Sequence, residues 1–184
     1  MPVFVSLLRA VNVTGHNKIS MEALRTLYDS LGLRDAQTYI QSGNVVFRTS
    51  QRDPSRLAER IADAIQDRFG FRPGVLVRTC SDLRNAIARN PLPARAATDP
   101  GKLLVVFLSG DPHPEARDKV LGIEVGPEEL RIVGRELYIY FPDGQGRSKL
   151  SLPLVEKVLK TPGTGRNWNT VTRLLAMAER LEAS

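Results

Sequence analysis

Cysteine is nearly absent from this chain, which has only Cys80 among its 184 residues. A single cysteine excludes an intrachain disulfide and is typical of proteins from a reducing compartment. Long apolar runs are also missing, because no stretch approaches the roughly 18 apolar residues of a membrane-spanning helix. The first residues, Met1–Val5, lack the basic segment of a signal peptide and predict a folded strand. We therefore expect a cytoplasmic protein without a membrane partner.

The usual signatures of catalysis are missing as well. The two histidines, His16 and His113, have no cysteine or carboxylate at ligand spacing, so no metal site is predicted. No nucleophile elbow is present, and no glycine-rich dinucleotide fingerprint follows the first strand, so no cofactor is predicted. The segment Gly144–Lys149 has the wrong spacing for a phosphate-binding loop. No side chain stands out as a general base, and whether the protein is an enzyme stays open.

Positive charge is present in excess, with a formal net charge of +6. The excess lies in the first half of the sequence, where arginines are spread along the predicted helices rather than clustered. Such a distribution is typical of a solvated helix surface, and a nucleic-acid patch is the alternative interpretation.

The first half alternates strands and helices in the order β-α-β-β-α-β, which is the ferredoxin-like arrangement. Its first strand is apolar on both faces, which predicts a central strand covered on both sides. Serine, proline and glycine at the helix ends set the boundaries. The expected elements are a strand at Pro2–Arg9, a helix capped by Ser20 and ended by Gly32, strands at Asp35–Gln41 and Asn44–Thr49, a helix from Pro54 to Gly70, a strand at Gly74–Thr79, and a short helix capped by Ser81.

The second half repeats the order β-α-β-β-α without an obvious closing strand. A Pro/Ala-rich connection at Asn90–Gly101 is the expected boundary between the halves. The fold class predicted is α+β, with two ferredoxin-like halves in tandem at residues 1–90 and 101–184, the second modified and followed by a C-terminal helix. Its expected elements are a strand at Lys102–Ser109, a helix at Glu115–Gly122, strands at Leu130–Val133 and Glu136–Phe141, a helix from Ser151 to Lys160, a loop at Thr161–Arg166, and a last helix capped by Asn167 and anchored by Trp168.

Four blocks of sequence resemble the bacterial family DUF1697. They are Leu7–Lys18, Tyr39–Phe47, Ser148–Leu150 and Arg166–Leu175, in that order along nearly the whole chain. The resemblance implies no activity, because the family is defined by sequence and has no settled function. The chain departs from the family pattern at three positions, where the family tends to have glycine or another small or basic residue: Ala10, Thr14 and His16.

The predicted topology brings two polar bends to one edge of the first sheet. The loop Ala10–Ile19, the turn Ser42–Asn44 and the start of the first helix should lie together there, because the strands alternate in direction. Free N–H groups and the positive dipole end of a helix start favour an anion. The alternative is that asparagine and glycine serve only turn geometry and capping. The polar residues gathered at this edge are Arg9, Asn12, Asn17, Lys18, Gln41, Ser42 and Asn44.

Two segments of the second half are further candidates for the anion site. The loop before the Ser151 helix carries Ser148 and Lys149, which form either an anion cradle or a plain turn. The start of the last helix carries Arg166, Asn167, Asn169 and Thr170, which would complete the site if the chain folds back onto the first half.

Three functions are compatible with these patterns. The first hypothesis is a small-ligand protein that binds a phosphorylated or carboxylated compound, in which Arg9, Lys18 and Arg166 hold the negative charge and Asn12, Asn44 and Asn169 orient neutral polar groups. The second is a nucleic-acid-binding module with distributed arginine contacts. The third is a structural or interaction protein that dimerises through a sheet face or edge. Base stacking on the sheet is disfavoured, because Phe4 is predicted to be core beneath the second half.

Overall fold

The computed structural model describes every residue from Met1 to Ser184 and shows an α+β protein. It contains two four-stranded antiparallel sheets and seven α-helices. The chain divides into two compact units, with residues 1–84 and 173–184 in the first and residues 85–172 in the second. Two helices contribute to both units: α3 (Cys80–Ala88) begins in the first and ends in the second, and α7 (Trp168–Ala183) does the reverse.

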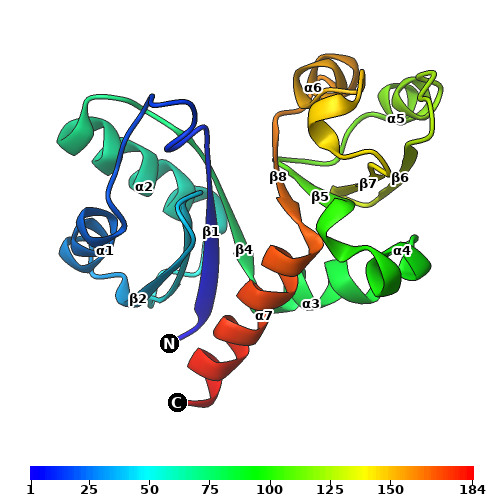
Figure 1. Cartoon of the computed structure of the whole chain (residues 1–184). Coiled ribbons are helices and arrows are strands. Elements are labelled where there is room, and N and C mark those ends of the chain that lie inside the picture. The colour runs from blue at the N-terminus through cyan, green and yellow to red at the C-terminus, as the bar shows by residue number, and fades with distance from the viewer. The chain divides into compact units, whose positions relative to one another are not determined.

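The first unit follows the element order that the sequence predicted (Figure 1). Strand β1 lies between β3 and β4 in a sheet of order β2-β3-β1-β4, and all of its residues before Arg9 are buried. The prediction of a central strand covered on both faces is therefore confirmed. The elements of this unit are β1 (Val3–Arg9), α1 (Met21–Ser30), β2 (Arg34–Tyr39), β3 (Asn44–Arg48), α2 (Pro54–Phe69), β4 (Gly74–Thr79) and the start of α3.

Local capping chemistry fixes both helices of this unit. The Ser20 hydroxyl accepts a hydrogen bond from the Ala23 N–H at 3.0 Å and caps α1, as expected. Pro54 occupies the first turn of α2, and Gly70 ends that helix with a left-handed φ of 82°.

The core of the first unit lies between its sheet and the helices α1 and α2. The Phe4 and Phe47 rings stack with centroids 6.2 Å apart, and Tyr28 of α1 meets Phe47 edge-on at 5.4 Å. The Tyr28 hydroxyl shares a 2.7 Å hydrogen bond with the buried hydroxyl of Ser6. The expectation that Phe4 lies beneath the second half was wrong, because alternation along β1 turns it toward α1 and α2.

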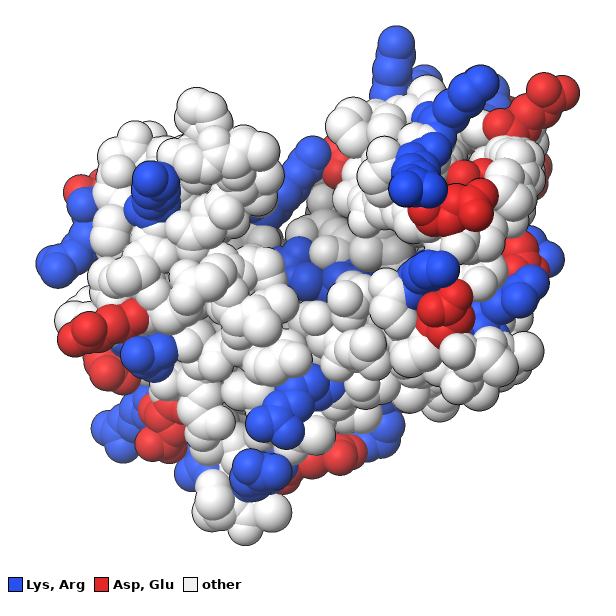
Figure 2. Space-filling view, viewed as in Figure 1, with Lys and Arg blue, Asp and Glu red and all other residues white.

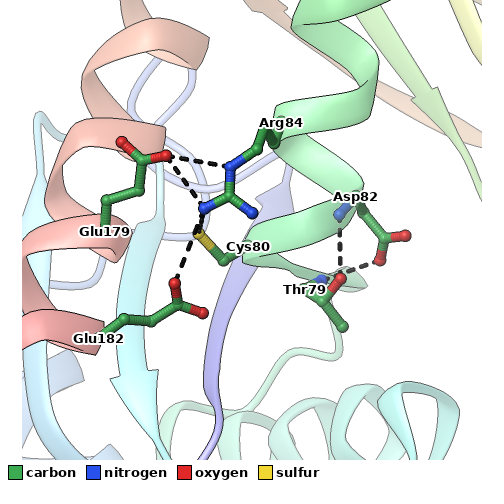
Figure 3. Close-up of polar contacts among 6 residues, drawn as sticks. All are labelled: Thr79, Cys80, Asp82, Arg84, Glu179 and Glu182. Carbon is green, nitrogen blue, oxygen red and sulfur yellow. Dashed lines mark hydrogen bonds and ion pairs between the residues drawn. The ribbon is translucent and has the colours of Figure 1, made fainter.

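The other face of the first sheet is held to the end of α7. Arg48 of β3 donates to the carbonyl oxygens of Leu181 and Ser184, at the C-terminal end of α7 where backbone carbonyls lack partners within the helix ladder. Arg84 forms ion pairs with Glu179 at 3.0 Å and Glu182 at 3.8 Å (Figure 3).

The N-cap of helix α3 lies two residues earlier than the sequence predicted. Thr79 and Asp82 form a reciprocal capping box, in which the Asp82 N–H donates to the Thr79 hydroxyl at 3.0 Å and the Thr79 N–H donates to the Asp82 carboxylate at 2.9 Å (Figure 3). The assignment of Ser81 as the cap was therefore wrong. Cys80 is buried beside Arg84. Burial first, and then the Glu182 carboxylate, raise the pKa of its thiol to about 11.

The second unit repeats the topology of the first, with the sheet order β6-β7-β5-β8. Its fourth strand, β8, pairs with β5 along Gly163–Asn167, so the expected loop at Thr161–Arg166 and the missing closing strand were wrong. The elements are the end of α3, α4 (Pro93–Thr98), β5 (Leu103–Leu108), α5 (Pro114–Leu121), β6 (Glu129–Val133), β7 (Glu136–Tyr140), α6 (Leu152–Leu159), β8 (Gly163–Asn167) and the start of α7.

Close packing explains why β8 contains the glycines that prevented its prediction as a strand. A Cβ added at Gly163 would lie 2.9 Å from the Phe107 carbonyl oxygen, and one at Gly165 would lie 3.1 Å from the Leu104 side chain. Glycine in a strand marks such close approaches, although it lowers the strand propensity of the segment.

Helices cover both faces of the second sheet (Figure 1). Helices α5 and α6 enclose a core with Val106 and Leu137, and the end of α3 and α4 meet the other face. There the Tyr138 hydroxyl donates to the Ala86 carbonyl at 2.6 Å, and the Arg95 guanidinium lies 4.5 Å from the centroid of the Tyr140 ring. The expected Pro/Ala-rich connection at Asn90–Gly101 thus contains a helix.

A buried arginine occupies the same position in each sheet. Arg78 of β4 is the partner of Val5, and Arg166 of β8 is the partner of Val105. Both arginines are under 10% exposed, and each is followed by a helix. The two units therefore share strand order, register and this strand–helix junction. None of the helices is both long enough and apolar enough to traverse a lipid bilayer.

Candidate functional site

The two polar bends of the first unit meet at one edge of its sheet, as the topology predicted. Leu7 of β1 is the partner of Asn44 of β3, and the Leu8 N–H donates to the Gly43 carbonyl at 3.0 Å. The loop of residues 10–20 after β1 and the turn of residues 40–43 before β3 therefore start from neighbouring strand ends. We call this region the first edge.

The Asn12 side chain joins the two bends. Its amide nitrogen donates to the carbonyl oxygens of Ile19 and Gln41, each at 2.9 Å, and its oxygen accepts from the Ile19 N–H at 2.9 Å. The Asn17 amide donates to the Ala10 carbonyl at 3.1 Å across the same loop. These contacts favour the turn-geometry interpretation of both asparagines, since their amides hold the loop together.

The hairpin turn is equally well determined. Asn44 is fully buried, and its amide donates to the Tyr39 carbonyl at 3.0 Å and to the Ser42 hydroxyl at 2.8 Å. Gly43 has a φ of 78°, and a Cβ at this position would lie only 2.7 Å from the Leu8 Cβ. Glycine is required here for both conformation and space. Residues 42–44 thus fix the position of the bend.

Left-handed backbone is concentrated at the first edge. Only glycine adopts this region without strain, and a β-branched residue there is an outlier. Each non-glycine example costs on the order of 1–3 kcal/mol, with asparagine the least affected. Seven non-glycine residues of the chain have positive φ, and five of them lie in these two bends: Ala10 (59°), Asn12 (56°), Thr14 (49°), Asn17 (52°) and Ile40 (51°).

Two of the three residues that depart from the expected DUF1697 pattern have left-handed backbone. Ala10 and Thr14 both adopt the left-handed conformation that glycine favours. The loop therefore keeps a glycine-like path despite its side chains.

A small finger forms the outer part of the loop. Val13 and His16 make an isolated antiparallel bridge, in which the His16 N–H donates to the Val13 carbonyl at 3.0 Å around Thr14 and Gly15. Next to the Asn12–Gln41 contact, Val13 and Ile40 are each about half exposed.

The charge of the first edge is of one sign. Arg9 is half-buried at the end of β1, and Lys18 is exposed on the loop. Neither residues 1–21 nor residues 36–52 contain an aspartate or glutamate. Cationic side chains held on an ordered loop without neighbouring carboxylates in the same segments are suited to an anion.

Within the second unit, the predicted residues around the start of α7 have internal roles. Arg166 donates to the Thr164 hydroxyl at 2.7 Å and to the Gly165 carbonyl at 2.9 Å, and burial lowers the pKa of its guanidinium to about 10. Asn167 caps α7 by accepting from the Thr170 N–H at 2.9 Å, as expected. Thr170 is buried, and Asn169 is exposed. Trp168, expected as a core anchor, is only half-buried.

The Ser148 side chain in the loop before α6 has partners within the second unit. The Ser148 hydroxyl accepts from the Leu150 N–H at 3.0 Å. It also hydrogen-bonds the Glu128 carboxylate, which lowers the pKa of Glu128. A carboxylate beside this serine repels an anion, and Lys149 is exposed. The interpretation as a plain turn is favoured.

Sequence reasoning missed three residues of the first edge: Val13, His16 and Ile40. The Thr14–Gly15 pair between two residues of strand type was the available signal for the finger. Nothing in the local sequence indicates that Ile40 is left-handed, since isoleucine favours extended backbone.

Comparison with known proteins gives the fold and the family. The chain is similar to the structure of the conserved bacterial protein SP0830 from Streptococcus pneumoniae, with a TM-score of 0.73 and 23% identity over 96% of this chain and 98% of that chain. At this identity the similarity shows the fold alone. No curated protein matches the sequence. The model of the family described as "Protein of unknown function (DUF1697)" matches residues 1–138, which include the whole first edge. The chain belongs to the DUF1697 family.

Proposed function

We propose that the first edge binds a small anionic ligand with a phosphate or carboxylate group. Arg9 and Lys18 supply the positive charge, and the loop backbone positions them. Asn12, Asn17 and Asn44 act as scaffold, because their amides are engaged within the two bends. Ser42 is part of the same scaffold through its bond to Asn44.

The observation that carries this proposal is the concentration of left-handed residues in two bends without carboxylates. Strained conformations persist only where the surrounding structure imposes them, and they cluster at ligand sites. Here the hydrogen bonds of the Asn12 side chain hold the loop in these conformations. The strained backbone does not bury apolar side chains in the core, because the finger is exposed. A preordered loop binds a ligand more tightly, because less conformational entropy is lost on binding.

A thermal-shift panel of inorganic phosphate, nucleotides, sugar phosphates and carboxylates tests the proposal. We expect at least one class to raise the melting temperature of the full chain, and the shift to be reduced in Lys18→Ala and Arg9→Ala. Lys157→Ala and Arg52→Ala are the matched controls, because both residues are exposed and lie outside the first edge. A panel without any stabilising anion, or equal losses in the controls, would contradict the proposal.

Several finer predictions accompany this one. The element order and the sheet orders β2-β3-β1-β4 and β6-β7-β5-β8 support two ferredoxin-like halves in tandem. The domain limits of 1–90 and 101–184, the cytoplasmic location and the participation of residues 166–170 in the anion site stay predictions.

Nucleic-acid binding and dimerisation remain the alternatives to the small ligand. On the face that Figure 2 shows, Lys and Arg are interspersed with Asp and Glu, which does not favour a continuous basic surface. Phe4 and Phe47 are buried and offer no ring for base stacking. The edge strand β2 has an irregular register between Arg34 and Gln37, a feature that opposes edge-to-edge pairing. Salt-sensitive gel retardation and light scattering test these two alternatives.

A further inference from the structure

Ile40 is the least explained residue of the first edge. Its φ of 51° is unfavourable for a β-branched residue, and its side chain is 51% exposed. Neither backbone conformation nor burial accounts for isoleucine here, because asparagine or glycine would form the same turn with less strain. A contact made outside the folded chain would account for it.

A second exposed apolar side chain is carried by the loop segment that adjoins the Ile40 turn. Val13 is 53% exposed, and it follows Asn12, whose amide contacts the carbonyl of Gln41, the residue after Ile40. The two apolar side chains are thus presented by adjoining backbone segments. Lys18, one residue before Ile19 in the same clamped loop, places a positive charge in the same region.

We propose that the ligand of the first edge joins its anionic group to an apolar group, and that Ile40 and Val13 contact the apolar part. This inference rests on the proposed anion site and specifies its ligand. An isolated phosphate would leave both side chains in water, whereas an amphipathic anion would bury them while its charge meets Lys18. The shared chemistry covers phosphate esters and carboxylates with an aromatic or aliphatic group.

Two pairs of probes separate the apolar contribution from the charge. Methyl phosphate and phenyl phosphate carry the same anionic group, as do acetate and hexanoate, and each pair differs in its apolar part. Dissociation constants come from amide chemical-shift titrations of the full chain. We expect the apolar member of at least one pair to bind about tenfold tighter. The gain arises because binding removes the remaining exposed surface of two aliphatic side chains from water. Which pair shows the gain separates phosphate esters from carboxylates.

The variant Ile40→Asn isolates the side chain, because asparagine tolerates the left-handed backbone. We expect the ratio of the two dissociation constants to fall toward one in Ile40→Asn and in Val13→Thr. Leu121→Asn is the matched control, since Leu121 is 47% exposed on the second unit and should leave the ratio unchanged. Thermal melts confirm that each variant is folded.

The outcomes distinguish this inference from the proposed function. Equal affinity within both pairs, with binding of methyl phosphate or acetate retained, overturns the inference and leaves the anion site standing. Binding of none of the four probes overturns both. The inference is also overturned if Ile40→Asn and Leu121→Asn change the ratio of the two dissociation constants equally, because the apolar contact would then lie elsewhere.

Discussion

The corresponding edges of the two units have the same topology and different loops. In the first unit the Leu8 N–H donates to the Gly43 carbonyl at 3.0 Å, and in the second the Leu108 N–H donates to the Arg135 carbonyl at 2.9 Å. The loop that follows spans residues 10–20 in the first unit and only residues 109–113 in the second. The same strand arrangement therefore carries a long loop in the first unit and a short loop in the second.

The two loops are also held in different ways. In the second unit Arg117 donates to the carbonyl oxygens of Gly134 at 2.5 Å and Pro112 at 3.2 Å and pairs with Asp111 at 3.3 Å. That edge has no left-handed residue other than glycine, and it contains a carboxylate. The first edge is strained and basic, whereas its counterpart is relaxed and of mixed charge. Since the second unit forms the same strand arrangement without such strain, the fold itself does not require the strain of the first edge, which supports the proposed anion site.

The largest difference is expected when each hairpin glycine is replaced. Gly43→Ala places a Cβ against Leu8 in a left-handed backbone, and overpacking together with strain should lower the free energy of unfolding by roughly 3 kcal/mol. Gly134 has a φ of 58°, but a Cβ there would meet only the flexible ends of the Arg89 and Glu136 side chains, at 3.6 and 3.7 Å, so Gly134→Ala should cost about 1 kcal/mol. Urea unfolding measures both, and equal losses would contradict the close packing of Gly43.

The next difference concerns the two side chains that hold the loops. Asn12→Ala removes three hydrogen bonds and leaves alanine at a left-handed φ, which should lower the free energy of unfolding by roughly 2 kcal/mol. Amide hydrogen exchange should rise across residues 12–19, and anion binding should weaken. Arg117→Ala should loosen residues 109–113 without a loss of anion binding. Weaker binding in Arg117→Ala alone would place the site outside the first edge.

Relief of strain should act in the opposite direction. Ala10→Gly and Thr14→Gly introduce the residue that favours positive φ, and each should raise the free energy of unfolding by roughly 0.5 kcal/mol despite the added entropy of the unfolded chain. Anion affinity should fall at the same time, because glycine makes the unbound loop less ordered. Thermal melts and titrations of the two variants check this opposition. A loss of stability in both would show that the loop is not strained.

The last difference lies at the strand–helix junctions and appears only at high pH, where Cys80 in the first unit corresponds to Trp168 in the second. The thiol has a raised pKa in the folded chain, about 11 against 9.0, so the unfolded chain loses its proton first. Stability contributed by the neutral thiol is complete below pH 9 and is lost as the pH rises toward 11. Compared with Cys80→Ala, the wild type should therefore lose stability more steeply over this range in urea unfolding. Parallel pH profiles would contradict the raised pKa.

Local signals were sufficient for most of the fold. Apolar periodicity together with Ser20, Pro54 and Gly70 located the helices of the first unit, because caps act within one turn. Strand β8 was missed for a physical reason: its glycines have low strand propensity, and only the long-range pairing with β5 makes the segment extended. The short helix α4 was missed because proline and alanine there were interpreted as a linker.

The candidate site was predictable in its location but not in its chemistry. Topology placed the two bends together, since strand direction alone decides which ends meet. The role of Asn12 could not be predicted, because an asparagine that clamps a loop and one that contacts a ligand look alike in sequence. The sequence predicted Arg166 as a ligand contact. In the structure Arg166 is buried on β8, where its guanidinium donates to the Thr164 hydroxyl and the Gly165 carbonyl.

The most direct test of the account is an amide chemical-shift titration of the full chain with phenyl phosphate. Binding at the first edge predicts that the perturbed amides cluster at residues 9–18 and 40–43, with those of residues 109–117 and 133–136 unchanged. Perturbations at the second edge alone, or equally at both, would contradict the claim that the strained, basic loop of the first unit is the binding site.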